Sequence, residues 1–111
     1  MLLNKDQILG CNDIPSEVVE VPQWGGSVKV RGMTAGERDH FEDMIRTKGL
    51  SALRGTLAAM CIIDDDGKRL FTNREIEKLA DKSAEALDIV VAAASRLSGL
   101  TPEDAEYLEK A

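Results

Sequence analysis

The chain has 111 residues, of which 43% are apolar and 31% are charged, and its formal net charge is −6. This length fits one domain with one core, and the apolar fraction excludes a disordered chain. Because nucleic-acid binding depends on clustered Lys and Arg, the acidic balance excludes a typical nucleic-acid binder and favours a protein partner.

The sequence also limits the environment and the cofactors of the protein. Residues 1–6 lack the basic and long apolar regions of a signal peptide, so we do not expect export. The apolar runs at 57–63 and 89–94 are far shorter than the ~20 residues that span a bilayer. Two cysteines without a CxxC motif and one histidine make neither a disulfide framework nor a zinc site. We therefore predict a cytoplasmic protein that binds no cofactor and no membrane.

The first elements are predicted to be a helical turn and a β-hairpin. Asn4 and Gln7 have the spacing of a capping box, which indicates a short helix that ends at Gly10. Valines alternate on both sides of residues 22–26, and this pattern predicts a β-hairpin over about residues 17–31.

Trp24 lies at the tip of this predicted hairpin. An aromatic side chain in an exposed loop is a natural anchor for an interface. The alternative is that Trp24 folds back and covers the small core. The residues alone leave both interpretations open.

Helical spacing dominates the rest of the chain. Thr34 and Glu37 form a capping box, Thr72 and Glu75 form a second one, and Ser83 is a further N-cap. Gly55 lies inside a predicted helix, where we expect it to cost ~1 kcal/mol relative to alanine. The predicted helices cover about residues 34–48, 50–63, 72–81, 83–98 and 101–111. The fold class is therefore α+β, mainly α.

The sequence lacks the residue pattern of an active site. His40 has only its chain neighbour Asp39 as an acidic companion, and neighbours on a helix point in different directions. The segment 64–67 has acidic residues like those of a calcium-binding loop. If Gly67 takes the glycine position of such a loop, however, the position of its glutamate ligand falls on Asn73. An acidic turn is predicted there, and we do not expect an enzyme.

Four motifs follow one another along the chain: VPQWGGSVKVRGMT at 21–34, ERDxFE at 37–42, CIxDxDGxxxFT at 61–72 and LSGL at 97–100. Their order and spacing resemble the tail assembly chaperones of long-tailed, siphovirus-type bacteriophages. The resemblance implies a chaperone that binds the tape measure protein, keeps this long helical protein soluble, and promotes tail tube assembly. It places the protein in the host cytoplasm and outside the mature virion.

The resemblance also implies a short and a long form. In the family the longer form arises by ribosomal frameshifting, and recruitment of the tail tube protein is attributed to its extension. This chain resembles the short form. The alternative function is a small acidic regulatory or adaptor domain that sequesters a host protein.

Two features of the sequence predict self-association. A lone two-stranded hairpin is marginal in water, and the helix at 83–98 is apolar on more than one face. Candidate protein-binding residues are the apolar anchors near the hairpin and on the last helix, namely Trp24, Met33, Tyr107 and Leu108.

Overall fold

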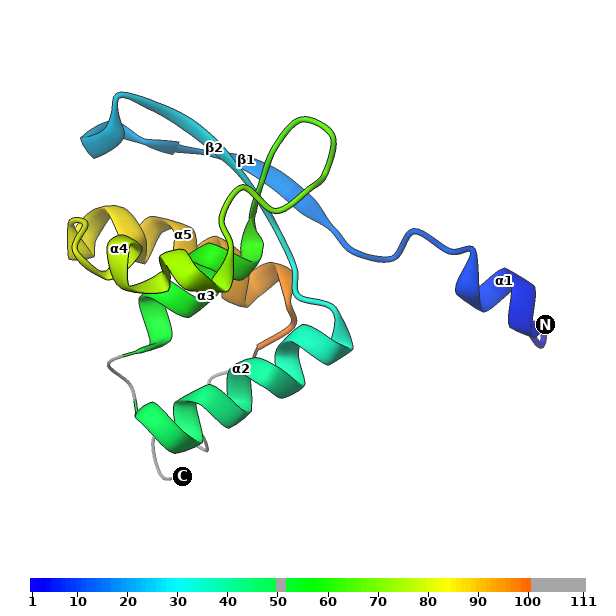
Figure 1. Ribbon diagram of the computed structural model, residues 1–111. Coiled ribbons are helices and arrows are strands. Elements are labelled where there is room, and N and C mark those ends of the chain that lie inside the picture. The colour runs from blue at the N-terminus through cyan, green and yellow to red at the C-terminus, as the bar shows by residue number, and fades with distance from the viewer. Residues whose placement is uncertain (50–51, 101–111) are drawn as a thin grey trace.

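The structure is a computed structural model that describes residues 1–49 and 52–100, and it has an α+β fold in which helices predominate (Figure 1). The predicted fold class is therefore confirmed. In chain order the elements are α1 (Lys5–Leu9), β1 (Ser16–Val21), the 3-10 turn η1 (Pro22–Trp24), β2 (Gly26–Arg31), α2 (Ala35–Lys48), α3 (Leu53–Cys61), β3 (Ile62–Ile63), the 3-10 turn η3 (Asn73–Glu75), α4 (Ile76–Ala80) and α5 (Ala84–Leu97). The helix predicted at 101–111 lies outside the described residues.

The predicted hairpin is present, but it is part of a three-stranded antiparallel sheet with the order β1-β2-β3. β1 and β2 pair with Val19 opposite Val28, and β3 adds Ile62 opposite Val30 on the other edge of β2. The prediction of a helix through residue 63 is thus wrong at its end. A short apolar run fits a buried strand as well as a helix, and these β-branched residues take the free edge of β2.

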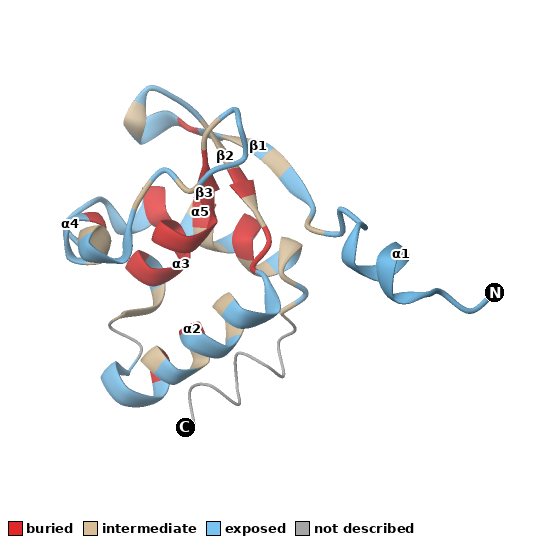
Figure 2. Cartoon of the chain, turned by 45° about the vertical axis from the view of Figure 1, so that its right-hand side comes forward, coloured by how far each residue is buried: buried red, intermediate tan, exposed pale blue. Residues whose placement is uncertain are grey.

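Helix α3 lies at the centre of the core, and its residues from Gly55 to Cys61 are all buried (Figure 2). It packs against α5 and α4, with further contacts to α2 and η3. Cys61 is fully buried, and this burial raises the pKa of its thiol to about 12. The thiol therefore stays protonated at neutral pH.

Gly55 allows helix α3 to approach the start of α4. A Cβ atom at this position would lie 2.7 Å from the backbone oxygen of Ile76 and 3.1 Å from its side chain. Gly32 has the same role beside α5, where a Cβ atom would lie 2.4 Å from the backbone oxygen of Leu97. Gly55 therefore has a packing role beyond the helix-propensity cost that the sequence predicts, because a larger residue would collide with the start of α4.

The N-caps of the long helices are as the sequence predicts. The hydroxyl of Thr34 accepts a hydrogen bond from the Glu37 N–H at 3.1 Å, and the Ser83 hydroxyl accepts one from Ala86 at 3.2 Å. The helix predicted at 72–81 begins instead with the 3-10 turn η3, in which the Glu75 N–H donates to the Thr72 carbonyl at 3.0 Å. Only Ile76–Ala80 is α-helical there.

Two ion pairs connect the sheet with the helices. Arg31 on β2 donates two hydrogen bonds to the Glu37 carboxylate, at 2.7 and 2.9 Å, and both side chains are largely buried. Burial alone would raise the pKa of Glu37, but the hydrogen bonds from Arg31 and Thr34 outweigh it and lower that pKa. On the surface, Arg96 of α5 holds Glu17 of β1 with hydrogen bonds of 2.6 and 2.8 Å.

The acidic segment 64–67 is a turn, as predicted. Its Asp64 carboxylate accepts hydrogen bonds from the backbone N–H groups of Asp66 and Lys68, at 2.9 and 3.0 Å. Gly67 has a positive φ of 83°, which favours glycine in this position.

Candidate protein-binding surface

Residues 1–10, which we call the N-terminal arm, carry most of the large apolar side chains that the described structure leaves exposed. Helix α1 lies within this arm, away from the body of the molecule, and buries no residue (Figure 1). Its predicted capping box is present: Asn4 and Gln7 exchange two hydrogen bonds of 2.9 Å. The exposed apolar residues of the arm are Met1, Leu2, Leu3, Ile8 and Leu9.

The tip of the hairpin is a 3-10 turn that brings Trp24 over the body. Pro22 begins the turn, and Gly25 ends it in a left-handed conformation with φ of 73°. Trp24 is half-buried and packs against the core. Of the two interpretations left open by the sequence, the structure thus favours partial covering of the core, with part of the indole still accessible.

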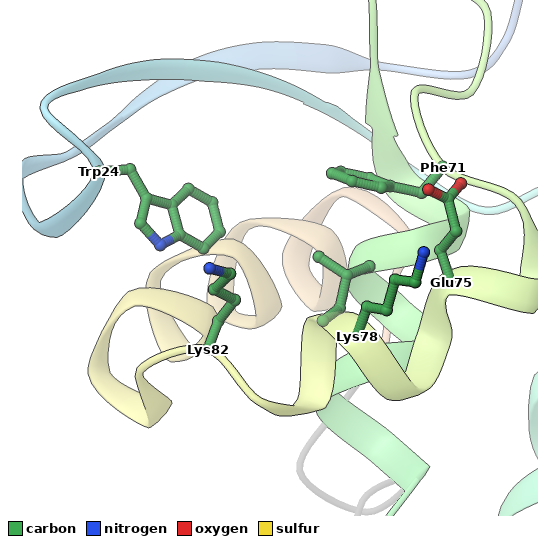
Figure 3. A pocket seen from close by; sticks show the side chains of 6 residues that line it. Trp24, Phe71, Glu75, Lys78 and Lys82 are labelled. Carbon is green, nitrogen blue, oxygen red and sulfur yellow. The ribbon is translucent and has the colours of Figure 1, made fainter.

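The accessible part of Trp24 forms one wall of a surface pocket, which we call the Trp24 groove (Figure 3). Phe71 forms another wall, and Leu79 of α4, which is only 5% exposed, also lines the groove. The groove has a volume of about 330 Å³. This volume is at the small end of ligand pockets, which run from roughly 300 to 1,000 Å³, so it suits a few side chains.

Charged side chains surround these apolar side chains. Lys78 and Lys82 line the groove on the α4 side, together with Glu75. The Glu75 carboxylate already accepts a hydrogen bond from the backbone N–H of Thr72, at 2.9 Å. The rim therefore carries an excess of positive charge on a chain whose net charge is −6.

The four candidate binding residues lie in different parts of the chain and differ in burial. Trp24 is in the groove. Met33 is only 8% exposed, and its N–H donates to the Ser98 hydroxyl at 2.9 Å, so its side chain belongs to the core. We therefore exclude Met33 from the candidate surface. Tyr107 and Leu108 lie outside the described residues.

The two arguments that led from sequence to self-association do not hold in the structure. The hairpin is not a lone two-stranded unit, because β3 pairs with β2 at Lys29 and Val30. The apolar faces of α5 are wrapped by α3, β1, β2 and η1 of the same chain. The sequence predicts neither the N-terminal arm nor the groove as a binding feature, although large apolar residues on both sides of the capping box at Asn4 and Gln7 are a signal of the arm.

Within residues 1–49 and 52–100, no group of three or more His, Cys, Asp or Glu side chains could hold a metal ion. His40 is exposed on α2. Over the same described part of the chain, no helix combines the length and the apolar character needed to cross a membrane.

The fold and its surface define a small α+β protein built around one central helix, and a solved structure shares this fold. The structure of the tail assembly chaperone of bacteriophage HK97 superposes with a TM-score of 0.61, covering 87% of this chain and 96% of that chain at 17% sequence identity. No family model and no curated protein matches the sequence significantly.

Proposed function

We propose that this protein is a phage tail assembly chaperone that binds the tape measure protein, keeps it soluble and promotes assembly of the tail tube. The observation that carries the proposal is the shared fold, because the likeness extends over almost the whole of both chains. The order of the four sequence motifs supports the same conclusion independently of the coordinates. The protein would act in the cytoplasm of the bacterial host and would not remain in the virion.

The surface properties suit a chaperone for a long helical client. Such a client needs many weak, reversible contacts along its length, and each contact is best made by a few apolar anchors within a charged rim. Trp24 in its groove and the exposed apolar arm have this character. A longer, frameshifted form would supply the contact with the tail tube protein, and copies of the short form would associate along the client.

Co-expression tests the proposal directly. A tape measure protein from the same phage should move from the insoluble to the soluble fraction when the chain is present. Trp24→Ala and Leu108→Asp should each reduce that rescue. The matched control is Val18→Asp, which changes an exposed apolar residue of β1 away from the groove and the arm.

Each variant must keep its fold for the result to count, and the protection of Cys61 from a thiol reagent provides that check. A client that stays insoluble with the wild-type chain, even together with the longer form, would contradict the proposed function. A slippery heptamer near the end of the gene with an overlapping downstream frame would be independent support.

A further inference from the structure

The Trp24 groove places hydrogen-bond donors beside its apolar walls. In Figure 3 the Lys82 side chain rises toward Trp24, and the edge of the indole that carries its nitrogen is turned toward Lys82. Among residues 1–49 and 52–100, neither the indole N–H nor the ammonium groups of Lys78 and Lys82 have a hydrogen-bond or ion-pair partner. Indole and ammonium groups donate hydrogen bonds and cannot accept them. An anionic acceptor on a partner would therefore satisfy them.

The carboxylates of the same segment do not neutralise these lysines inside the groove. Within the described part of the chain, Glu75 is the one carboxylate that lines it. That carboxylate accepts hydrogen bonds from the backbone N–H and the hydroxyl of Thr72, at 2.9 and 3.3 Å. Glu77 lines a separate cleft between α4 and α2. The groove thus presents two lysines against one carboxylate, and that carboxylate already caps η3.

Lys78 and Lys82 have the spacing of one helical turn. Helix α4 ends at Ala80, but the chain continues in a turn in which the Lys82 N–H donates to the Leu79 carbonyl at 3.0 Å. Side chains four residues apart lie on one side of a helix. A partner helix repeats its own side chains at the same interval, so two of its carboxylates one turn apart can reach both ammonium groups.

We propose that the Trp24 groove binds an acidic amphipathic helix of the client protein. Apolar side chains of this helix pack against Trp24 and Phe71, as in other complexes in which a helix lies in a groove. One carboxylate accepts hydrogen bonds from the indole N–H and from Lys82, and a second, one turn away, pairs with Lys78. The inference rests on the proposed function, because the client is the partner, and it adds the site and the chemistry that the client presents.

A synthetic peptide tests the site without the whole client. The probe is a helical peptide with blocked ends, leucines along one face and glutamates one turn apart beside them. Its matched control carries glutamine in place of every glutamate. Trp24 is the only tryptophan of the chain, so its fluorescence reports the groove directly. We expect a saturable change with the glutamate peptide, weaker at high salt, and an affinity about tenfold lower for the glutamine peptide.

Variants of the full chain then identify the groups that bind. Lys78→Gln with Lys82→Gln should weaken binding of the glutamate peptide by about three- to tenfold, as two exposed ion pairs would, and should leave the glutamine peptide nearly unaffected. The control Lys5→Gln with Lys68→Gln removes the same charge at exposed positions outside the groove and should bind as the wild type does. Trp24→Phe, followed by calorimetry, keeps an aromatic wall without the N–H donor. It should weaken binding of the glutamate peptide more than that of the glutamine peptide.

Three results would overturn the inference. Equal affinities for the two peptides would mean that the groove recognises apolar surface alone. An equal loss in the control variant would mean that net charge attracts the peptide, and not the groove. Trp24 emission that changes with protein concentration alone would assign the groove to a second copy.

The site and the proposed function can fail separately. A client that the Lys78 and Lys82 variant keeps as soluble as the wild type does would overturn the inference and leave the proposed function standing. Peptide binding that follows the expected pattern, beside a client that stays insoluble with the wild-type chain, would contradict the proposed function and support the chemistry of the groove.

Discussion

Helix α3 and the N-terminal arm are both apolar, but α3 is buried and the arm is exposed. From Gly55 to Cys61 every residue of α3 is buried, whereas α1 buries none. The difference lies in position within the fold. Gly55 lets α4 approach the backbone of α3, and the large Leu57 and Met60 side chains fill the core, whereas the arm projects away from the body of the molecule. The core is therefore complete without the arm.

The energetic consequence follows from burial. Removing a leucine-sized side chain from water contributes about 1.5 to 3 kcal/mol. In α3 that gain contributes to folding. In the arm no such gain is made within the described chain, so substitutions in the two regions should affect the stability of the monomer differently: those in the core should lower it, and those in the arm should leave it nearly unchanged.

The largest effect on stability is expected for Phe41→Ala. Phe41 is fully buried on α2 and is among the largest side chains of the core. Its truncation leaves a cavity, and such changes cost about 3 to 5 kcal/mol. Urea unfolding should show a lower midpoint with an unchanged slope. Met44→Ala, at a half-buried position of the same helix, should cost clearly less, and equal losses would mean that α2 is not packed as described.

The next effect concerns the ion pair between β2 and α2. Glu37→Gln should cost about 1.5 to 3 kcal/mol at pH 7, the usual contribution of hydrogen bonds to charged groups. The folded protein lowers the pKa of Glu37. Its contribution is therefore complete above the ordinary glutamate pKa of about 4.3 and is lost as the pH falls through that value toward the folded-state pKa.

Unfolding measured from pH 7 down to acid should thus show a smaller loss of stability in Glu37→Gln than in the wild type. Glu20→Gln, at an exposed position of β1, is the control and should leave the pH dependence unchanged. If both variants follow the wild-type curve, the Arg31–Glu37 pair does not contribute as proposed.

A third prediction concerns Gly55, where alanine should be less favourable than glycine although it is usually the better helix former. Gly55→Ala should destabilise the protein by about 1 to 3 kcal/mol, because the new methyl group would press against the backbone of Ile76. Gly36→Ala in α2 has open space around its Cβ position and should stabilise the fold by up to about 1 kcal/mol. Thermal melts that move in the same direction for both would contradict the close packing of α3 on α4.

Local signals in the sequence predicted those elements that depend on local chemistry. The capping boxes at Asn4 and Thr34 and the N-cap at Ser83 depend on residues within one turn, and all three are present. The hairpin was also predictable, since alternation of valines is a property of two adjacent segments. The turn at 64–67 was predictable as well, because the Asp64 carboxylate accepts hydrogen bonds from backbone N–H groups close to it in the sequence.

The remaining features depend on contacts between distant segments. Ile62 forms a strand because it pairs with Val30 on the edge of β2, 32 residues earlier in the chain. Gly55 is needed because Ile76 lies against it, and nothing within its own helix indicates this. The groove joins Trp24 from the hairpin with Phe71 and Leu79 from the α4 region, so periodicity along one segment could not reveal it.

The smallest effect on stability is expected in the arm. Leu2→Asp with Leu9→Asp should change the free energy of unfolding of the monomer by no more than about 0.5 kcal/mol, as is usual for surface substitutions without tertiary contacts. The measurement must be made at a concentration low enough to avoid association, because binding of a second copy to the folded state would itself add apparent stability.

The two cysteines make this comparison sharper within one experiment. Burial raises the pKa of Cys61 to about 12 and shields the thiol, so it should react only when the core opens. Cys11 is exposed beside the arm and should react rapidly in the folded protein. In the arm variant the slow reaction of Cys61 should keep its wild-type rate, whereas Phe41→Ala should accelerate it. An arm variant that accelerates the Cys61 reaction equally would show that the arm supports the core after all.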